Sequence, residues 1–446
     1  MICRSQHDIL HVIVLSRFSV KCSIQHFVCL QPPLQHLKAS NSLLVCRTLN
    51  AQALMLQDKE VNVTAADDAY SKLPETYEMW QNLVNTLFPT TADSIREKHA
   101  NARPEKFWWY PWMTLRPFFK SKGYTLFDYD ISKKNRLPKF EGSPALDSFG
   151  LFGNRDPKVM ERTWGNSSTT AWPARDEQNR DVMIKVVAKT FQECPEGSTE
   201  LRILKFLSSS AMRADPRNST IKILEFHDYH GWQFVVMPYL DCCADYPFLS
   251  LKECLDFACQ LLDTLAFLHE NKIAHLDISH ENILMNHHGA LPRRECITEE
   301  AILIFDPVPE FRSTFPVKYF MIDFGNSVFF SPGLIPSECL VPPKDWGRPH
   351  RAPETSGHAV FNPFAADVYQ TAQFFYIFFG KAISPAIPGL LELLQDMASD
   401  QPSERISMGT AASRMRKLYE TLLRENSQVD KVVVELADFE KIPRRL

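Results

Sequence analysis

Residues 275–282 read His275-Leu276-Asp277-Ile278-Ser279-His280-Glu281-Asn282. The stretch places an acid and an amide five residues apart. It follows a helical pattern of apolar residues at 251–269, and it precedes the apolar run 283–285. This combination is the strongest chemical signal in the sequence.

Three further motifs lie on either side of this stretch. Upstream, the run Val182-Met183-Ile184-Lys185 puts a lysine at the end of an apolar strand pattern. Downstream, the apolar run 319–322 is followed by Asp323-Phe324-Gly325, and Arg351-Ala352-Pro353-Glu354 comes later. Each motif alone is a weak signal. The ordered set is specific, because chance agreement of all four motifs in this order is improbable.

The ordered set resembles the signature motifs of protein kinases, and the resemblance covers residues 149–424. Short β-branched runs at 182–187 and 234–237 come before long helical patterns at 251–269 and 366–379. Strands followed by helices favour a sheet-rich lobe before a helical one. The fold class implied is therefore α+β, a two-lobed protein-kinase-like fold with a small β-rich N-lobe, a larger α-helical C-lobe and an N-terminal extension.

The lysine of the upstream strand matches the residue that holds the α- and β-phosphates of ATP in this family. An isolated buried ammonium group is costly, so Lys185 needs a carboxylate partner. Glu200 fits this role, because the apolar spacing after it matches a helix packed on the sheet. Glu193 and Glu196 are the competing partners.

The resemblance also implies a metal site and a base. Phosphoryl transfer asks a protein mainly for positioning and charge neutralisation. Asn282 and Asp323 offer the hard oxygen ligands that suit Mg²⁺, and Asp277 would accept or orient the proton of the substrate hydroxyl. His275 is expected to support the loop by packing. Gly325 is expected to let the backbone turn after the metal ligand.

Two supports are implied in the helical lobe. Asp367 matches the buried helix acid that binds the backbone of the catalytic loop; a plain acid at a helix N-terminus is the alternative. Arg405 matches the arginine that pairs with Glu354. Loss of one partner from such a buried pair typically costs about 3–5 kcal/mol.

Residues 234–240 resemble the strand that enters the adenine-binding hinge. Met237 would be the gatekeeper. The carbonyl of Pro238 and the N–H of Leu240 would bind the adenine, so the missing N–H of proline does no harm.

The phosphate-covering loop departs from the family pattern. Its best register begins at Gly165 and places Ser167 and Thr170 where the second and third glycines belong. Glycine lets the backbone approach phosphate closely, so this loop should hold ATP less well. Trp172 and Met183 replace smaller residues that would cap the adenine, which predicts a tight pocket.

Other departures concern regulation and substrate. Leu276 replaces an arginine that pairs with phosphate on the activation segment, so control by phosphorylation is in doubt. Ser279 replaces a lysine near the γ-phosphate, which removes one positive charge. Residues 286–316 form a long insert. The short span 367–405 predicts reduced substrate-docking helices.

Composition excludes some classes of protein. The net charge of −4 gives no basic field that would attract nucleic acid. No apolar run reaches the ~18 residues that a membrane span needs. Eleven cysteines without a C-x-x-C pair indicate free thiols in a reducing compartment, and thus a cytoplasmic or nuclear location. The oligomeric state is left open.

The chain divides into four predicted regions: a leader at 1–59, an aromatic-rich extension and linker at 60–148, the kinase-like domain at 149–424 and a tail at 425–446. Residues 1–57 hold five Lys/Arg and a single acid. This composition resembles a mitochondrial transit peptide, with a disordered or mistranslated leader as the favoured alternative. The aromatic cluster at 107–127 is expected to pack onto a neighbouring domain rather than bind nucleic acid.

The sequence thus predicts an ATP- and Mg²⁺-dependent protein kinase of the Ser/Thr type, with a protein as substrate. A kinase-like scaffold that holds nucleotide weakly is one alternative, and a small-molecule hydroxyl kinase is another. The arrangement is similar to fungal kinase-like proteins with a divergent kinase domain.

Overall fold

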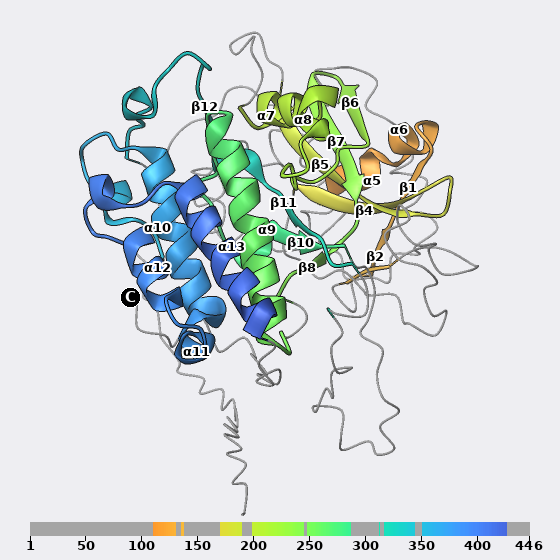
Figure 1. Cartoon of the computed structure of the whole chain (residues 1–446). Coiled ribbons are helices and arrows are strands. Elements are labelled where there is room, and N and C mark those ends of the chain that lie inside the picture. Colours follow the sequence, from red (N-terminus) through yellow and green to blue (C-terminus); the bar gives the residue numbers. More distant parts are fainter. Residues whose placement is uncertain are drawn as a thin grey trace, which may run out of the picture. The chain divides into compact units, whose positions relative to one another are not determined.

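The structure, a computed structural model, describes residues 110–130, 135–137, 170–189, 199–244, 248–286, 312, 316–343 and 350–425. An antiparallel β-sheet comes first along the chain, and a group of helices follows (Figure 1). The predicted α+β order of a sheet-rich lobe before a helical lobe is confirmed. The predicted leader and most of the insert at 286–316 lie outside the described residues.

The first lobe is built on a five-stranded sheet in the order β1-β4-β5-β7-β6, with every neighbouring pair antiparallel. Its strands are β1 (Tyr124–Leu126), β4 (Ala171–Asp176), β5 (Asp181–Lys189), β6 (Glu225–Tyr229) and β7 (Trp232–Pro238). A separate hairpin joins β2 (Asp128–Asp130) to β3 (Asn135–Leu137). Lys185 lies on the central strand β5, opposite Ala171 of β4 and Val235 of β7.

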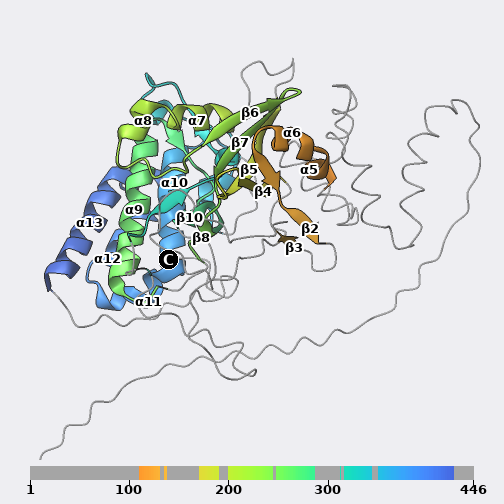
Figure 2. The same ribbon diagram turned by 90° about the vertical axis from the view of Figure 1, so that its right-hand side faces the viewer.

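The two faces of the sheet carry different cores, because successive side chains of a strand point to opposite faces. On one face, Trp172 and Phe234 pack against the short helices α5 (Tyr110–Thr114) and α6 (Arg116–Ser121). Figure 2 shows these helices on one side of the sheet, and α7 (Thr199–Leu207) and α8 (Ser210–Ala214) on the other.

The described part of the aromatic segment belongs to this lobe. The ring of Trp112 lies 5.9 Å from that of Trp172 and 6.3 Å from that of Phe234. The edge strand β1 then pairs with β4. The aromatic residues therefore pack onto the sheet, as expected, and the lobe begins upstream of the predicted boundary at 148/149.

The second lobe is helical. Its helices are α9 (Leu251–Glu270), α10 (Pro363–Phe375), a π-helical turn at Tyr376–Gly380, α11 (Lys381–Ile383), α12 (Leu390–Met397) and α13 (Met408–Glu425). Short 3₁₀ turns lie at His280–Asn282, Phe324–Asn326, Pro336–Glu338, Pro353–Ser356, Ser384–Ala386 and Pro402–Glu404. No helix in the described ranges is long and apolar enough to cross a membrane.

Side-chain caps fix where the two main helices begin. Ser250 accepts a hydrogen bond from the Glu253 amide, and the Glu253 carboxylate accepts one from the Leu249 amide, so α9 starts at Leu251. Asn362 caps α10 in the same way, with Pro363 in the first turn. In the sequence, α9 and α10 lie on either side of residues 275–282, the predicted catalytic stretch.

Small antiparallel pairs hold that stretch. β10 (Ile283–Met285) lies between β8 (Asp241–Cys242) and β11 (Tyr319–Met321), and β9 (Ile273–Ala274) pairs with β12 (Val328–Phe329). The amide of Ile322 also donates to the carbonyl of Asn282 at 3.0 Å. Asn282 is therefore held beside the residue that precedes Asp323.

Candidate active site

Three charged side chains from distant parts of the sequence meet at the sheet. The ammonium nitrogen of Lys185 lies 2.6 Å from Glu200 Oε1 and 2.7 Å from Asp323 Oδ1. Glu200 comes from the first turn of α7, and Asp323 follows β11. The predicted pairing of Lys185 with Glu200 is therefore present, while Glu193 and Glu196 lie outside the described residues.

In this cluster, Lys185 shifts the pKa of both carboxylates, and both carboxylates shift the pKa of Lys185. Burial works against the charge on Lys185, but the carboxylates of Asp323 and Glu200 hold its pKa above the ordinary value. Lost hydration would raise the pKa of Asp323, yet the Lys185 ammonium lowers it to about 2. Burial raises the pKa of Glu200, against the pull of Lys185. Lys185 therefore remains a cation and Asp323 an anion at neutral pH.

Asp277 and Asn282 face one another across the catalytic stretch. The amide nitrogen of Asn282 donates to the Asp277 carbonyl at 2.8 Å and to Asp277 Oδ2 at 3.1 Å. Because the nitrogen makes these bonds, the amide oxygen of Asn282 is the atom left to bind a metal ion. Together with the 43% exposed carboxylate of Asp323, it forms a donor set that fits Mg²⁺.

The backbone of the catalytic stretch is fixed by Asp367. This carboxylate is fully buried in α10 and accepts hydrogen bonds at 2.7 Å from the amides of His275 and Leu276. Its Oδ2 also lies 3.0 Å from Nε2 of His269. These contacts agree with the interpretation of Asp367 as a support for the loop, since a plain helix-terminal acid would face solvent.

His275 is a structural residue in this arrangement. Its side chain is buried, and its Nδ1 accepts a hydrogen bond from the Asp277 amide at 3.3 Å. The proton is then carried by Nε2, which lies 3.0 Å from the Ile322 carbonyl. The His275 ring also packs against Phe324, with 5.2 Å between centroids. These contacts join the catalytic stretch to Asp323-Phe324-Gly325.

The turn after the candidate metal ligand differs from the prediction. The left-handed backbone is at Asp323 itself, with φ of 63° and ψ of 77°, whereas Gly325 lies outside the left-handed region. A Cβ atom at Gly325 would lie 3.1 Å from Asp323 Oδ1 and 3.6 Å from Glu200 Oε2. Glycine therefore leaves space beside the acids, where a Cβ atom would crowd Asp323, and it is not required by an unusual φ.

The predicted ion pair of the helical lobe is also present. Arg405 binds Glu354 through two parallel contacts of 2.6 and 2.9 Å, and its guanidinium lies 4.8 Å from the centre of the Tyr369 ring. Further bonds join it to the carbonyls of Ser399 and Ala365. The pair ties the turn at 353–356 to the start of α10.

The nucleotide-binding predictions meet different outcomes. The prediction that Trp172 lies at the adenine pocket is wrong. Its side chain is fully buried on the face of the sheet opposite Lys185, and its Nε1 donates to the Phe127 carbonyl. Met237 lies on the same face as Lys185, opposite Met183. Thr170 directly precedes β4.

The rest of the predicted nucleotide site is described only in part. Pro238 ends β7, and Leu240 is buried just after it. Gly165 and Ser167 lie outside the described residues.

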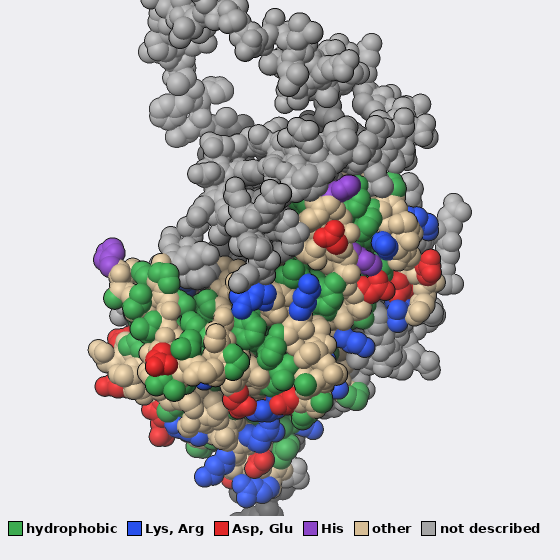
Figure 3. Space-filling view, turned by 90° about the horizontal axis from the view of Figure 1, so that it is seen from above, with side chains coloured by type: hydrophobic (Ala, Val, Ile, Leu, Met, Phe, Trp, Pro, Cys, Tyr) green, Lys and Arg blue, Asp and Glu red, His purple; other side chains and the backbone are tan. Residues whose placement is uncertain are grey.

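Leu276 stands where the family places an arginine, and its surroundings are apolar. It is buried with Cys339 and Ala352, which follow Asp323 in the sequence, and with Phe364 and Tyr369 of α10. The described part of the segment between Asp323 and Glu354 is therefore anchored to residues 275–282 by apolar packing. Seen from above in Figure 3, hydrophobic side chains also reach the surface of the molecule. Between residues 334 and 360, the large apolar side chains that are exposed are Leu334, Ile335, Leu340 and Val360.

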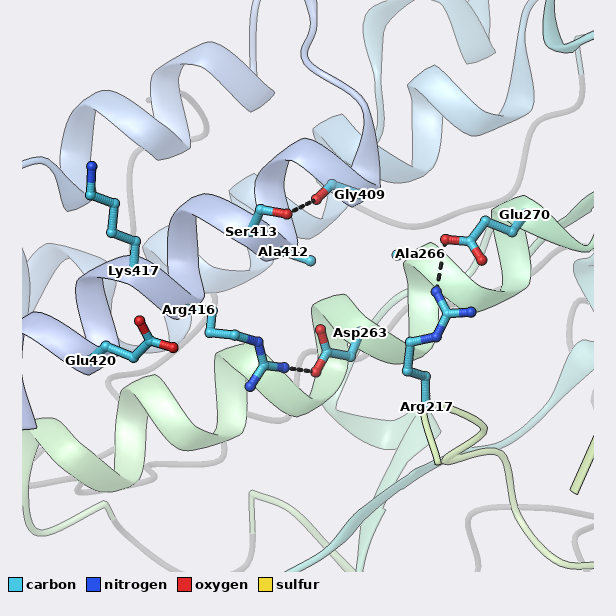
Figure 4. A pocket seen from close by; sticks show the side chains of 10 residues that line it. All are labelled: Arg217, Asp263, Ala266, Glu270, Gly409, Ala412, Ser413, Arg416, Lys417 and Glu420. Atoms are coloured by element: carbon cyan, nitrogen blue, oxygen red, sulfur yellow. Dashed lines mark hydrogen bonds and ion pairs between the residues drawn. The ribbon is translucent and has the colours of Figure 1, made fainter. Parts of the chain in front are cut away.

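A groove lies away from these residues, between α9 and α13 (Figure 4). It has a volume of about 440 Å³ and carries both acids and bases. Four of its charged residues form two ion pairs: Arg217 binds Glu270 at 2.8 Å, and Arg416 binds Asp263. None of the predicted site residues lines it.

One contact to the predicted base was not foreseen. Asn326, in the turn after Gly325, donates from its amide nitrogen to Asp277 Oδ2 at 3.2 Å. The only signal in the sequence is an amide residue immediately after the Asp-Phe-Gly motif. In addition, Ser279 Oγ is buried and has no hydrogen-bond partner in the described part of the chain.

Comparison with known proteins shows a partial similarity to protein kinases. No family model matches the chain. The dual specificity protein kinase CLK1 of Homo sapiens is 31% identical over 116 residues, which cover 24% of this chain and 23% of that protein. The dual specificity protein kinase CLK4 of Mus musculus is 29% identical over 113 residues, or 23% and 22% of the two chains.

The chain thus matches less than a quarter of the length of each of these curated relatives. The similarity is distant, and it agrees with a protein-kinase-like chain. The relatives come from human and mouse, and the resemblance to fungal proteins stays a prediction.

Proposed function

We propose that the chain is an ATP-dependent phosphotransferase that acts on Ser or Thr hydroxyls of a protein and uses Mg²⁺. The observation that carries the proposal is the ion-pair cluster of Lys185, whose ammonium nitrogen lies 2.6 Å from Glu200 Oε1 and 2.7 Å from Asp323 Oδ1. Asp277 and Asn282 lie beside this cluster, linked to it through the pairing of β10 with β11. An ammonium group, two metal-binding oxygen donors and a carboxylate base are the parts that phosphoryl transfer needs.

Each residue has a proposed role. Bound Mg·ATP supplies the phosphoryl group and the positive charge of the metal. Lys185 would turn from Asp323 to the phosphate oxygens, with Glu200 retaining it in place. Asp323 and Asn282 would hold the metal. Asp277 would receive the proton of the acceptor hydroxyl at its carboxylate.

The adenine would lie along the end of β7. Met237 faces the same side of the sheet as Lys185, which supports its role as gatekeeper. We retain the Pro238 carbonyl and the Leu240 amide as the proposed adenine contacts. Gly165, Ser167 and Thr170 remain the proposed phosphate-covering residues, whereas Trp172 is left out because it faces the other way.

The test is transfer of labelled phosphate from Mg·ATP to a mixture of unfolded protein substrates such as casein. We expect transfer by the wild-type chain and loss of transfer in Asp277→Asn and Asp323→Ala. The exposed acid Asp400 offers a matched control, since Asp400→Asn should keep full activity. Full activity in Asp323→Ala would refute the metal-binding role.

A second candidate function is a nucleotide-binding scaffold without transfer. It is favoured by the chain connection between β1 and β4, which runs from 127 to 170 in place of a short glycine-rich hairpin. A rise in melting temperature with Mg·ATP, together with no transfer to any protein, would support the scaffold. Transfer to small hydroxyl compounds alone would instead indicate a small-molecule kinase.

A further inference from the structure

The carboxylate of Asp277 is held by two side-chain amides that bind the same oxygen. Asn282 donates to Oδ2 at 3.1 Å and Asn326 donates to it at 3.2 Å. Asn282 belongs to the motif that contains the base. Asn326 comes from a different segment, the 3₁₀ turn Phe324–Asn326 that follows the candidate metal ligand.

Asn326 is held in place by Phe324 before it and Ser327 after it in the chain. Phe324 is fully buried and packs on the ring of His275. The amide of Ser327 donates to the Phe324 carbonyl at 3.1 Å, and its hydroxyl donates to the His275 carbonyl at 3.0 Å. Phe324 and Ser327 both contact His275, which lies two positions before Asp277. The side chain of Asn326 is therefore held close to the Asp277 carboxylate.

The charge around the base makes this contact important. Ser279 stands where the family has a lysine, so a cation is missing two residues from Asp277. The two side chains that donate to its Oδ2, Asn282 and Asn326, are neutral amides. Neutral donors orient a carboxylate but do not cancel its charge, so they suit a group that has to accept a proton.

We propose that Asn326 is a positioning residue that orients Asp277 for the transfer step. By holding Oδ2 together with Asn282, it orients the carboxylate that receives the proton of the acceptor hydroxyl. This inference rests on the proposed phosphotransferase function. Asn326 makes no contact with the nucleotide in this scheme.

The test compares Asn326→Leu, which keeps a similar volume without the donor, with Asn326→Gln, which keeps an amide. Hydrogen bonds to charged groups imply that Asn326→Leu lowers kcat by about 10- to 100-fold. KM for ATP should stay within about twofold, because the substitution removes an interaction needed in the transition state. Asn326→Gln should recover part of kcat. Asn271→Leu, which removes an amide at the end of α9, is the matched control and should leave kcat unchanged.

A double-mutant cycle separates positioning from a general structural effect. In an Asp277→Asn background, where the slow residual transfer is followed under single-turnover conditions with excess enzyme, Asn326→Leu should have no further effect if it acts through Asp277. An equal loss in both backgrounds, or an Asn326→Leu variant with wild-type kcat, would overturn the inference.

An experiment without activity tells this failure from that of the proposed function. The side-chain amide resonances of Asn326, followed by NMR in the full chain, should shift in Asp277→Ala and stay in place in Asp400→Asn. Unchanged resonances overturn the contact itself. If Asp277→Ala shifts these resonances while the wild-type chain transfers no phosphate, the contact stands and the proposed function is overturned.

Discussion

Removal of the Glu354 carboxylate should destabilise the helical lobe strongly. The Arg405 side chain is only 1% exposed, and its two contacts to Glu354 measure 2.6 and 2.9 Å. Glu354→Ala would leave this buried guanidinium without its carboxylate, which typically costs about 3–5 kcal/mol. Because Glu354 is 15% exposed, water can enter, and we expect about 3 kcal/mol. For a domain of this size, that lowers the melting temperature by about 6–12 °C.

The assay is thermal unfolding followed by circular dichroism, with an exposed Arg–Glu pair as the control. Glu392 lies 3.9 Å from Arg414 and is 74% exposed, so Glu392→Ala should change stability by no more than about 0.5 kcal/mol. Tyr369→Phe keeps the ring beneath Arg405 and should also cost less than Glu354→Ala. Equal melting temperatures for Glu354→Ala and Glu392→Ala would refute the reasoning, since the buried and the exposed pair would then contribute alike.

Three further changes test the loop and its surroundings. Asp367→Asn replaces one accepting oxygen with a donor, so one amide of the catalytic stretch loses its partner; we expect at least a tenfold loss of transfer with the far-ultraviolet spectrum of the folded chain retained. Gly325→Ala crowds Asp323 and Glu200, and it should weaken Mg·ATP binding measured by calorimetry, with little effect on the melting temperature. Leu276→Arg puts a cation into an apolar cluster, and it should destabilise the chain by about 3 kcal/mol or more in urea unfolding. An Arg variant as stable as the wild type would show that the cluster can open to solvent.

The residues that were predicted well share one property: their chemistry demands a partner at a known place in a motif. A buried lysine requires a carboxylate, and the helical pattern after Glu200 identified it among three candidates. The same holds for Arg405 and Glu354, where a buried guanidinium requires an acid. A buried charge that requires a partner of opposite charge can be recognised in a sequence, because few residues can serve as that partner.

Trp172 was misplaced for a geometric reason. A shift of one residue along a strand moves a side chain to the opposite face. Ala171 is opposite Lys185 and shares its face, so Trp172 points with Ile184 to the other core. The linear spacing from a degenerate loop could not fix this register, because the loop lacks the glycines that would anchor the alignment.

The edge strand β1 was missed because three residues carry no periodic signal. Tyr124–Leu126 is too short for alternation to be distinguished from chance, and its partner β4 lies far along the chain. What keeps it in place is burial of the aromatic residues around it, in particular Trp112 and Phe119 against the sheet. The boundary at 148/149 therefore followed the motif resemblance rather than the packing.

The long connection between β1 and β4 decides where nucleotide affinity can come from. A tight glycine-rich hairpin would surround the phosphates with backbone N–H groups, and the sequence between 127 and 170 has no such glycine pattern. The charged cluster around Lys185 lies on the other side of the phosphates in the proposed arrangement, and it holds two carboxylates against one ammonium. Such a cluster repels a bare polyphosphate, but it attracts one that carries a divalent cation. Binding should therefore depend more on the metal ion than on the loop, and Asp323, kept ionised by Lys185, is the residue through which this dependence would act.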